Sequence, residues 1–311
     1  MPAYIFGPVP SRRLGRSLGV DLVPFKTCTY DCIYCQLGRT TCKTTTRKEW
    51  IPLEDVLKQL QDKLTTEPNY ITLSGSGEPT LFSRIGELIS RIKKMTDIPV
   101  AVLTNGSLLG ISEVRAALME ADLVMPSLDA GDEKMFRYVN RPVADITFDR
   151  MVEGLVTFGK EYSGRYWLEV FLLGGVTGFS AEVEKIANIS QQIDPDRVQL
   201  NTVTRPPAEN FAYPVSKEQM NVFATIFGDR AEVIADYRGT HQQAEFVARR
   251  EDVLNLLCRR PCTTGDIAKG LGIHPNEVAK YVEQLSIEGL LGRETRNGRV
   301  YYKASRHEAN Q

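Results

Sequence analysis

Short apolar runs alternate with amphipathic segments from about residue 17 to residue 236. Seven runs rich in Val, Ile and Leu predict strands, at residues 17–23, 70–74, 100–105, 123–129, 167–173, 198–203 and 231–236. Segments of helical periodicity lie between them, at residues 53–64, 84–95, 112–121, 147–162 and 181–193. The runs are apolar throughout, as is typical of strands covered on both faces. The alternation predicts an α/β fold with a parallel sheet, as an open doubly wound sheet or as a complete or partial barrel.

Polar side chains stand where four of these runs end. They are Ser74, Asn105, Ser127 with Asp129, and Asn201. The carboxyl edge of a parallel sheet is where active sites of such folds are built. Polar residues are also common in turns. Their recurrence after successive strands favours a shared site at this edge.

A different pattern begins near residue 245. Three helical segments are followed by two β runs that meet at Asn297-Gly298, a strong hairpin signal. The middle helix, "TGDIAKGLG", ends in Gly, and "HPNEVAKYVEQLSIEG" follows with Pro near its start. This resembles a winged helix–turn–helix domain. The sequence therefore predicts two domains, at residues 1–240 and 245–306.

Composition narrows the class of protein. The chain has 311 residues, of which 42% are hydrophobic and 25% charged, as is typical of a globular protein. No apolar run has the roughly 18 residues of a membrane span, and the opening "MPAYIFGPVPSRR" lacks the apolar core of a signal peptide. A net charge of -1 excludes a broadly cationic nucleic-acid binder. We therefore expect a cytoplasmic protein that does not contact membranes.

Three cysteines lie close together in "KTCTYDCIYCQLG". Cys28, Cys32 and Cys35 have the spacing C-x3-C-x2-C. Clustered cysteines in an unexported protein ligate metal or act in redox chemistry more often than they form disulfides. Thiolates suit zinc, copper and iron–sulfur clusters. A structural zinc site needs four ligands, for which Cys42 is a candidate, whereas a [4Fe–4S] cluster on three thiolates leaves one iron open. A zinc knuckle and unconnected thiols stay open as alternatives.

The segment "CTYDCIYC" resembles the signature of the radical S-adenosylmethionine (SAM) enzymes, C-x3-C-x-aromatic-C. The resemblance implies that Cys28, Cys32 and Cys35 hold a [4Fe–4S] cluster whose open iron chelates SAM, and that Tyr34 lies against the adenine. In this family an electron from the cluster cleaves SAM to methionine and a 5′-deoxyadenosyl radical, which abstracts hydrogen from a substrate. Such enzymes take electrons from donors such as flavodoxin or ferredoxin. The cofactor carries the difficult chemistry, and the protein positions it.

The segment "ITLSGSGEPTL" is similar to the Gly-Gly-Glu-Pro loop with which the family binds the amino group of SAM. Gly77, Glu78 and Pro79 match this loop, with Ser76 in place of the first Gly and Gly75 beside it. A Gly-rich turn lets backbone carbonyls approach a ligand closely, and Glu78 supplies a negative charge.

The resemblance also implies a partial (β/α)6 barrel, because six βα units fit that form. Asn105, together with Ser127 or Asp129, then falls where the family contacts the ribose and carboxylate of SAM.

The segment before the triad and the "CQLG" after it look like one branch of the superfamily, iron–sulfur oxidoreductases related to tRNA-wybutosine-synthesising enzymes. Basic residues in this region and in a later Arg-Pro loop are candidates for binding a phosphate or carboxylate of the substrate. These residues are Arg12, Arg13, Arg16 and Arg205. A solvated surface loop explains the first three equally well.

The C-terminal segment offers a surface for a macromolecule. Its hairpin carries Arg293, Arg296 and Arg299 with two tyrosines, which suits RNA or a peptide leader. An architectural or dimerising role stays open.

The helix expected to enter a DNA groove is poorly suited to binding DNA. It carries Glu277, Glu283 and Glu288 against Lys280, and affinity for DNA depends on neutralising phosphates. The sequence therefore favours a radical SAM enzyme acting on an unidentified substrate, tRNA ahead of a peptide. Two alternatives are an iron–sulfur transcription regulator that responds to redox state, and a zinc-stabilised nucleic-acid-binding protein.

Overall fold

The computed structural model describes residues 2–11, 13–234, 250–271, 275–296 and 298–305. The chain divides into two compact units. The first consists of Met1–Val20, Glu54–Thr72 and Tyr237–Gln311, and the second of Asp21–Leu53 and Leu73–Asp236.

The second unit contains five consecutive strands that pair in parallel, each with the next along the chain. These strands are β6 (Val100–Leu103), β7 (Leu123–Met125), β8 (Arg165–Leu172), β9 (Arg197–Thr202) and β10 (Ala231–Val233). The prediction of a mainly parallel sheet is confirmed. Every predicted run contains a strand, because apolar side chains on both faces of a strand are buried only when helices cover one face and the core the other.

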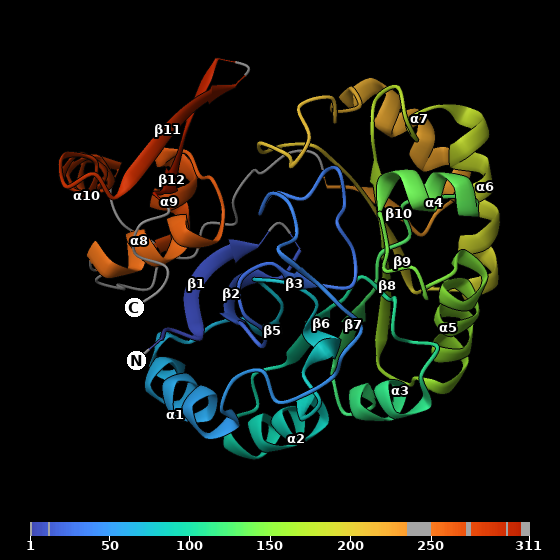
Figure 1. Ribbon diagram of the computed structural model, residues 1–311, viewed down its shortest axis with the longest axis horizontal. Helices are drawn as coiled ribbons and strands as arrows, with labels where there is room; N and C mark the ends of the chain where they lie inside the picture. Colours follow the sequence, from blue (N-terminus) through green and yellow to red (C-terminus); the bar gives the residue numbers. More distant parts are fainter. Residues whose placement is uncertain (1, 12, 235–249, 272–274, 297, 306–311) are drawn as a thin grey trace. The chain divides into compact units, whose positions relative to one another are not determined.

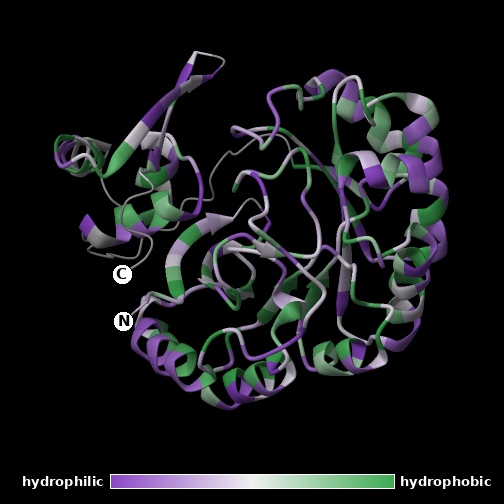
Figure 2. Ribbon diagram, viewed as in Figure 1, coloured by the Kyte–Doolittle hydropathy of each residue, from purple (hydrophilic) through white to green (hydrophobic). Residues whose placement is uncertain are grey.

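Helices cover the outer side of these strands (Figure 1). They are α2 (Ile85–Met95), α3 (Ser112–Leu118), α4 (Glu133–Val139), α5 (Phe148–Glu161), α6 (Ser180–Ile193) and α7 (Lys217–Phe227). The buried residues of α2 are Ile85, Leu88, Ile89 and Ile92, a spacing that forms one face of a helix. Figure 2 shows this division, with hydrophobic and hydrophilic stripes along the helices.

Two helices of this unit were not predicted from the sequence. Helix α4 has only seven residues and two buried side chains, so its periodicity is too short to detect. Helix α7 begins at the N-cap Ser216, whose side chain accepts from the backbone of Gln219, and buries only Met220 and Phe223. Both helices follow long loops at the end of a strand.

In the first unit, β1 (Ile5–Ser11) pairs in antiparallel fashion with β2 (Gly15–Val20), and β5 (Tyr70–Leu73) is the next strand in order. Strand β1 was not predicted because it contains Pro8 and Pro10, which lack the N–H that a ladder needs. It is an edge strand with one neighbour, a position where proline is tolerated. Helix α1 (Leu53–Lys63) and the 3₁₀ turn Leu64–Thr66 precede β5.

The C-terminal part of the first unit contains the three helices and the hairpin that the sequence predicts. They are α8 (Arg250–Arg259), α9 (Thr264–Leu271), α10 (Pro275–Ile287), β11 (Leu291–Arg296) and β12 (Arg299–Ala304). Val9 of β1 is buried in the same hydrophobic cluster as side chains of all three helices. The winged helix assignment of residues 245–306 stays a prediction, and its turn residue Asn297 lies outside the described residues.

The tyrosines of the hairpin are part of the core. Tyr301 is buried, and Tyr302 packs against the hydrophobic cluster. The backbone of Tyr302 also exchanges two hydrogen bonds with that of Cys262, whose side chain is buried, whereas Cys258 is exposed. Within the described ranges, no helix has the length and apolar character needed to cross a membrane.

Candidate functional site

The three cysteines lie on a loop that begins at the two-residue strand β3 (Thr27–Cys28). After Cys28 the chain turns twice, with Cys35 N donating to Cys32 O at 3.1 Å and Gly38 N to Cys35 O at 3.0 Å. The loop returns at β4 (Cys42–Lys43), which pairs in parallel with β3. The first turn spans the interval from Cys32 to Cys35, and the second turns the chain away after the last cysteine of the triad.

The loop is fixed by the end of α4. Ile33 N donates to Val139 O at 2.9 Å, and Asp31 N donates to Asn140 O at 3.0 Å. The left-handed backbone of Arg141, with φ of 46°, turns the chain at this point. Helix α4 therefore holds the Cys loop, although the sequence did not reveal it.

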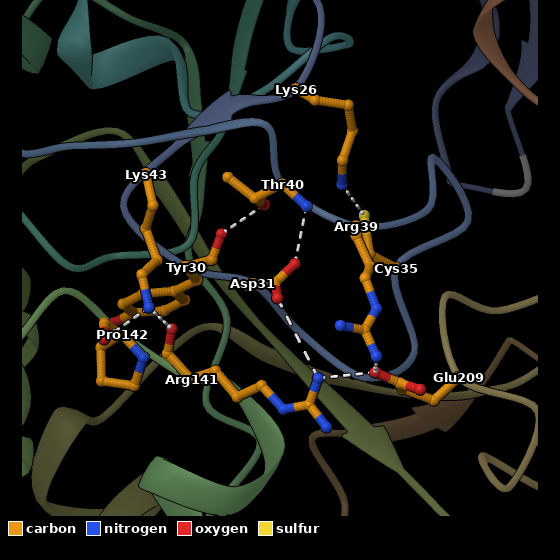
Figure 3. A network of polar contacts seen from close by, with 10 residues as sticks. All are labelled: Lys26, Tyr30, Asp31, Cys35, Arg39, Thr40, Lys43, Arg141, Pro142 and Glu209. Atoms are coloured by element: carbon orange, nitrogen blue, oxygen red, sulfur yellow. Dashed lines mark hydrogen bonds and ion pairs between the residues drawn. The ribbon is translucent and has the colours of Figure 1, made fainter.

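An acidic residue joins a third segment to the loop (Figure 3). Glu209 Oε1 accepts from Arg141 at 2.6 Å and from Arg39 at 2.8 Å, and Glu209 N donates to Ile33 O at 2.9 Å. Segments that follow β7 and β9 thus converge on the loop. A site held on several rigid elements keeps its ligands in a defined geometry.

Each of the three sulfur atoms accepts a hydrogen bond from a different part of the chain. Cys28 Sγ accepts from Tyr30 N and Asn105 Nδ2, both at 3.5 Å. Cys32 Sγ accepts from Asn140 Nδ2 at 3.5 Å, and Cys35 Sγ accepts from Lys26 Nζ at 3.4 Å. N–H donors around sulfur are the surroundings in which iron–sulfur clusters are held and tuned.

The thiols influence one another's ionisation. Burial raises the pKa of Cys28 to about 12, and the nearby Glu78 carboxylate and Cys35 add to the effect. Burial also raises the pKa of Cys32, with contributions from Asp129 and both other cysteines, while the hydrogen bond from Asn140 lowers it. Three thiolates this close together are stable only with a positive centre among them.

This donor set fits a [4Fe–4S] cluster. The three thiols lie on one loop, influence one another's ionisation and each accept a hydrogen bond from an N–H donor. Among the residues that the structure describes, no three His, Cys, Asp or Glu side chains surround a single ion position. A cluster does not need that arrangement, since each thiolate binds its own iron. Cys42, the candidate fourth ligand, is exposed in β4.

The loop of residues 75–78 is bound to the segment that leads into Cys28. Ser76 O accepts from Lys26 N at 2.6 Å, and Glu78 N donates to Thr27 O at 3.1 Å. A Cβ on Gly77 would lie 1.8 Å from Thr27 O, so no other residue fits there. Ser76 N in turn donates to Asp21 at 2.8 Å. The match of this loop to the family pattern thus has a physical cause, a close backbone contact with the Cys segment.

The Glu78 carboxylate is buried and fully engaged by the protein. It accepts from Thr80 N at 3.0 Å, Thr80 Oγ1 at 2.6 Å, Thr104 Oγ1 at 2.6 Å and Asn105 N at 2.7 Å. Burial raises the pKa of Glu78, and these hydrogen bonds counteract it. Glu78 also caps the 3₁₀ turn Pro79–Leu81. Its side chain therefore joins this 3₁₀ turn to the residues that follow β6.

Replacing Glu78 with glutamine is expected to lower the free energy of unfolding by about 1–3 kcal/mol. One carboxylate oxygen becomes an N–H₂ group, which at the Oε2 position would face Asn105 N–H and leave that donor unpaired. Chemical denaturation of the protein measures this. The matched control is Glu87→Gln on α2, an exposed partner of Arg84, which we expect to change stability by about 0.5 kcal/mol or less. Unchanged stability of E78Q together with lost SAM binding would instead place the carboxylate in direct contact with the ligand.

Asp129 is the centre of a second buried group. Its carboxylate accepts from the Tyr34 hydroxyl, from Asn140 Nδ2 at 2.9 Å and from Phe171 N at 3.0 Å. Burial raises the pKa of Asp129 to about 6. The Tyr34 ring stacks on Phe171 with 4.1 Å between ring centroids. Asn140 thus bridges Asp129 and Cys32, and links the two predicted parts of the site.

The predicted residues at the strand ends take different positions. Asn105 bridges Cys28 and Thr29, with its Nδ2 2.7 Å from Thr29 Oγ1. Ser127 forms a parallel bridge with Glu169 of β8, and Asn201 Nδ2 donates to Glu169 Oε1 at 2.8 Å. All three residues lie in the second unit. Ser127 and Asn201 both contact Glu169, whereas Asn105 contacts the Cys loop.

Sequence reasoning missed three residues of this site, Lys26, Asn140 and Glu169. Glu169 is a charge in the middle of the apolar run "WLEVFLL", which is a detectable signal. Lys26 stands two residues before Cys28 in "KTC". Asn140 gives no local signal, since it lies 108 residues from its partner Cys32.

The predicted arginines are not shown to form one cluster. Arg12 lies outside the described residues. Arg13 and Arg16 belong to the first unit, where Arg16 donates to Thr66 O at 3.0 Å. Arg205 belongs to the second unit and donates to Gln36, beside Cys35, at 3.4 Å.

Comparisons with known proteins show which family the chain belongs to. The sequence profile of the radical SAM superfamily matches residues 22–194. A UPF0026 protein from Methanocaldococcus jannaschii is 33% identical over 309 residues, covering 96% of this chain and 94% of that protein. A protein named GTPase Obg from Brachyspira hyodysenteriae is 40% identical over 96% of this chain, which spans 45% of that protein's length.

A solved structure shares the fold. The radical SAM methyltransferase from Sphaerobacter thermophilus matches with a TM-score of 0.55 and 18% sequence identity, over 71% of this chain and 67% of that one. The fold is therefore the TIM-like partial barrel, and the choice left open by the βα alternation is resolved in favour of this barrel.

Proposed function

Because the chain belongs to the radical SAM superfamily, and within it to the UPF0026 family, we propose that Cys28, Cys32 and Cys35 hold a [4Fe–4S] cluster at which SAM is cleaved. Enzymes of this superfamily use both cofactors. The observation that carries the assignment is the hydrogen-bond donor on each of the three sulfurs. When bound, the cluster supplies the electron that cleaves SAM to methionine and a 5′-deoxyadenosyl radical, which abstracts hydrogen from the substrate.

The protein's own residues hold and orient SAM. We assign the contact with the SAM amino group to the backbone carbonyls of Gly75 and Gly77, since the Ser76 carbonyl accepts from Lys26 N and the Glu78 carboxylate accepts from Thr80, Thr104 and Asn105. Tyr34 contacts the adenine with its ring, which Phe171 supports by stacking. Asn105, together with Ser127 or Asp129, is assigned to the ribose and carboxylate. Burial of these groups excludes water from the place where a radical would form.

An anaerobic assay tests this function. The protein is reconstituted with iron and sulfide and reduced, SAM is added, and 5′-deoxyadenosine is measured by chromatography. The expected result is about four iron atoms per chain and formation of 5′-deoxyadenosine. Stoichiometric zinc without iron would contradict the enzyme assignment. Specific DNA binding that changes on cluster oxidation would favour the regulator instead.

The substrate is proposed to be a macromolecule, with RNA favoured over a peptide on the resemblance to the wybutosine branch. The proposed winged helix domain, residues 245–306, would present Arg293 and Arg299, both exposed, to the phosphates. The reductant is proposed to be a flavodoxin or ferredoxin, and the setting the cytoplasm. A rise in 5′-deoxyadenosine on adding cellular RNA, lost after ribonuclease treatment, supports an RNA substrate. A rise that survives ribonuclease and is lost after protease supports a peptide.

A further inference from the structure

Lys26 is a buried lysine whose ammonium group points at a sulfur of the proposed cluster site. The residue is 4% exposed, and Nζ donates to Cys35 Sγ at 3.4 Å (Figure 3). In the part of the chain that the structure describes, its Nζ forms no ion pair with a carboxylate. A buried cation is costly unless an anion compensates it. The arrangement therefore implies an anionic centre at Cys35.

The backbone holds Lys26 in a strained conformation that maintains this direction. Its φ is 62°, in the left-handed region that few side chains other than glycine adopt. Lys26 N donates to Ser76 O at 2.6 Å, and Lys26 O accepts from Thr41 N and Cys42 N, both at 3.1 Å. The residue is thus clamped between the 75–78 loop and the end of the Cys loop. Backbone strain that persists beside a site points to a function.

The nearby lysine of the same segment makes a contrasting contact. Lys43 Nζ donates to the backbone carbonyls of Arg141 at 3.3 Å and Pro142 at 3.4 Å, so its charge is directed at protein oxygens (Figure 3). Lys43 fastens the loop, whereas Lys26 faces the sulfur. The two residues allow the effect of a charge on the thiolate to be separated from an effect on the loop.

We propose that Lys26 raises the reduction potential of the cluster, so that a cellular reductant delivers its electron more easily. The proposal rests on the proposed function, because it needs the cluster on Cys35. One electron from a flavodoxin or ferredoxin adds one negative charge to the cluster and its thiolates. A charged N–H donor to a ligand sulfur stabilises the reduced form more than the oxidised form. Lys26 acts on a ligand of the cluster and is a positioning residue rather than a catalytic one.

A potentiometric titration without SAM tests this proposal. Reconstituted wild type, Lys26→Met, Lys26→Gln and Lys26→Arg are reduced stepwise at pH 8, and the reduced cluster is followed by electron paramagnetic resonance. At a fixed potential we expect about a tenfold lower ratio of reduced to oxidised cluster in K26M than in the wild type. For a one-electron couple this corresponds to a reduction potential about 59 mV lower. K26R is expected to recover most of the shift because it keeps the charge, and K26Q to recover little.

The control variant is Lys43→Met, which we expect to keep the wild-type potential. Equal potentials of wild type, K26M and K26Q would overturn the proposal while the cluster itself was present. So would a weaker affinity of K26M for SAM at an unchanged potential, which would make Lys26 a SAM ligand. If K26M binds no cluster, the test compares the reduction potentials of K26R, which keeps the charge, and K26Q, which removes it. Equal potentials for these two variants would overturn the role of the charge. A wild-type protein without iron would overturn the proposed function first.

Discussion

Replacing Cys32 with alanine is expected to abolish iron binding and cleavage of SAM together. Cys32 is the middle thiol of the triad, and a [4Fe–4S] cluster left with two thiolates would have two irons without protein ligands. Its sulfur also accepts from Asn140, which in turn donates to Asp129, so the change removes one link between the thiols and the Tyr34 group. Iron content, the visible absorbance of the reconstituted protein and 5′-deoxyadenosine formation measure the result.

The matched control is Cys42→Ala. Cys42 is exposed in β4 and takes part in the loop through its backbone, so its side chain can be removed without disturbing the pairing with Lys26. We expect C42A to retain iron and SAM cleavage. Loss of iron in C42A would mean that Cys42 completes a four-thiolate site, and a cluster with an open iron would then be wrong. Full iron content and activity in C32A would contradict the assignment of the triad.

The strands of the barrel could be predicted from the sequence because burial on both faces leaves a continuous apolar run. Strand β1 could not, since its prolines mimic a loop and its pairing with β2 makes it a strand. Helix α4 could not, since its seven residues bury only Phe136 and Val139. These failures share a cause. Each element is defined by what it packs against, which the local pattern does not contain.

The site shows the same limit at the level of single residues. The triad and the 75–78 loop were found because their residue types and short spacing resemble motifs of the radical SAM family. The contact between Asn140 and Cys32 joins positions 108 residues apart, and the sequence near either residue does not indicate it. The contact of Glu78 with SAM stays a prediction, and the structure adds that its carboxylate accepts four hydrogen bonds from the protein. Sequence motifs therefore located the loops, and only the fold showed which of their atoms form hydrogen bonds within the protein.

Gly77→Ala is expected to have the second large effect, on stability and on the cluster at once. The added Cβ would lie 1.8 Å from Thr27 O and 2.8 Å from Thr27 C, both backbone atoms. One of the two segments must move, and overpacking of this kind costs about 3 kcal/mol. The displacement would break the hydrogen bond from Glu78 N to Thr27 O and shift the residue that precedes Cys28. We expect a lower free energy of unfolding and a much reduced iron content.

Gly110→Ala is the control for this change. Its added Cβ would lie 3.4 Å from Arg150 O, an ordinary contact, so we expect stability and iron content close to those of the wild type. Chemical denaturation and iron analysis of both variants separate two outcomes. A G77A protein that is destabilised but binds iron fully would show that the 75–78 loop and the Cys segment are held independently. A G77A protein as stable as the wild type would contradict the close contact itself, and with it the physical reason for glycine at this position of the loop.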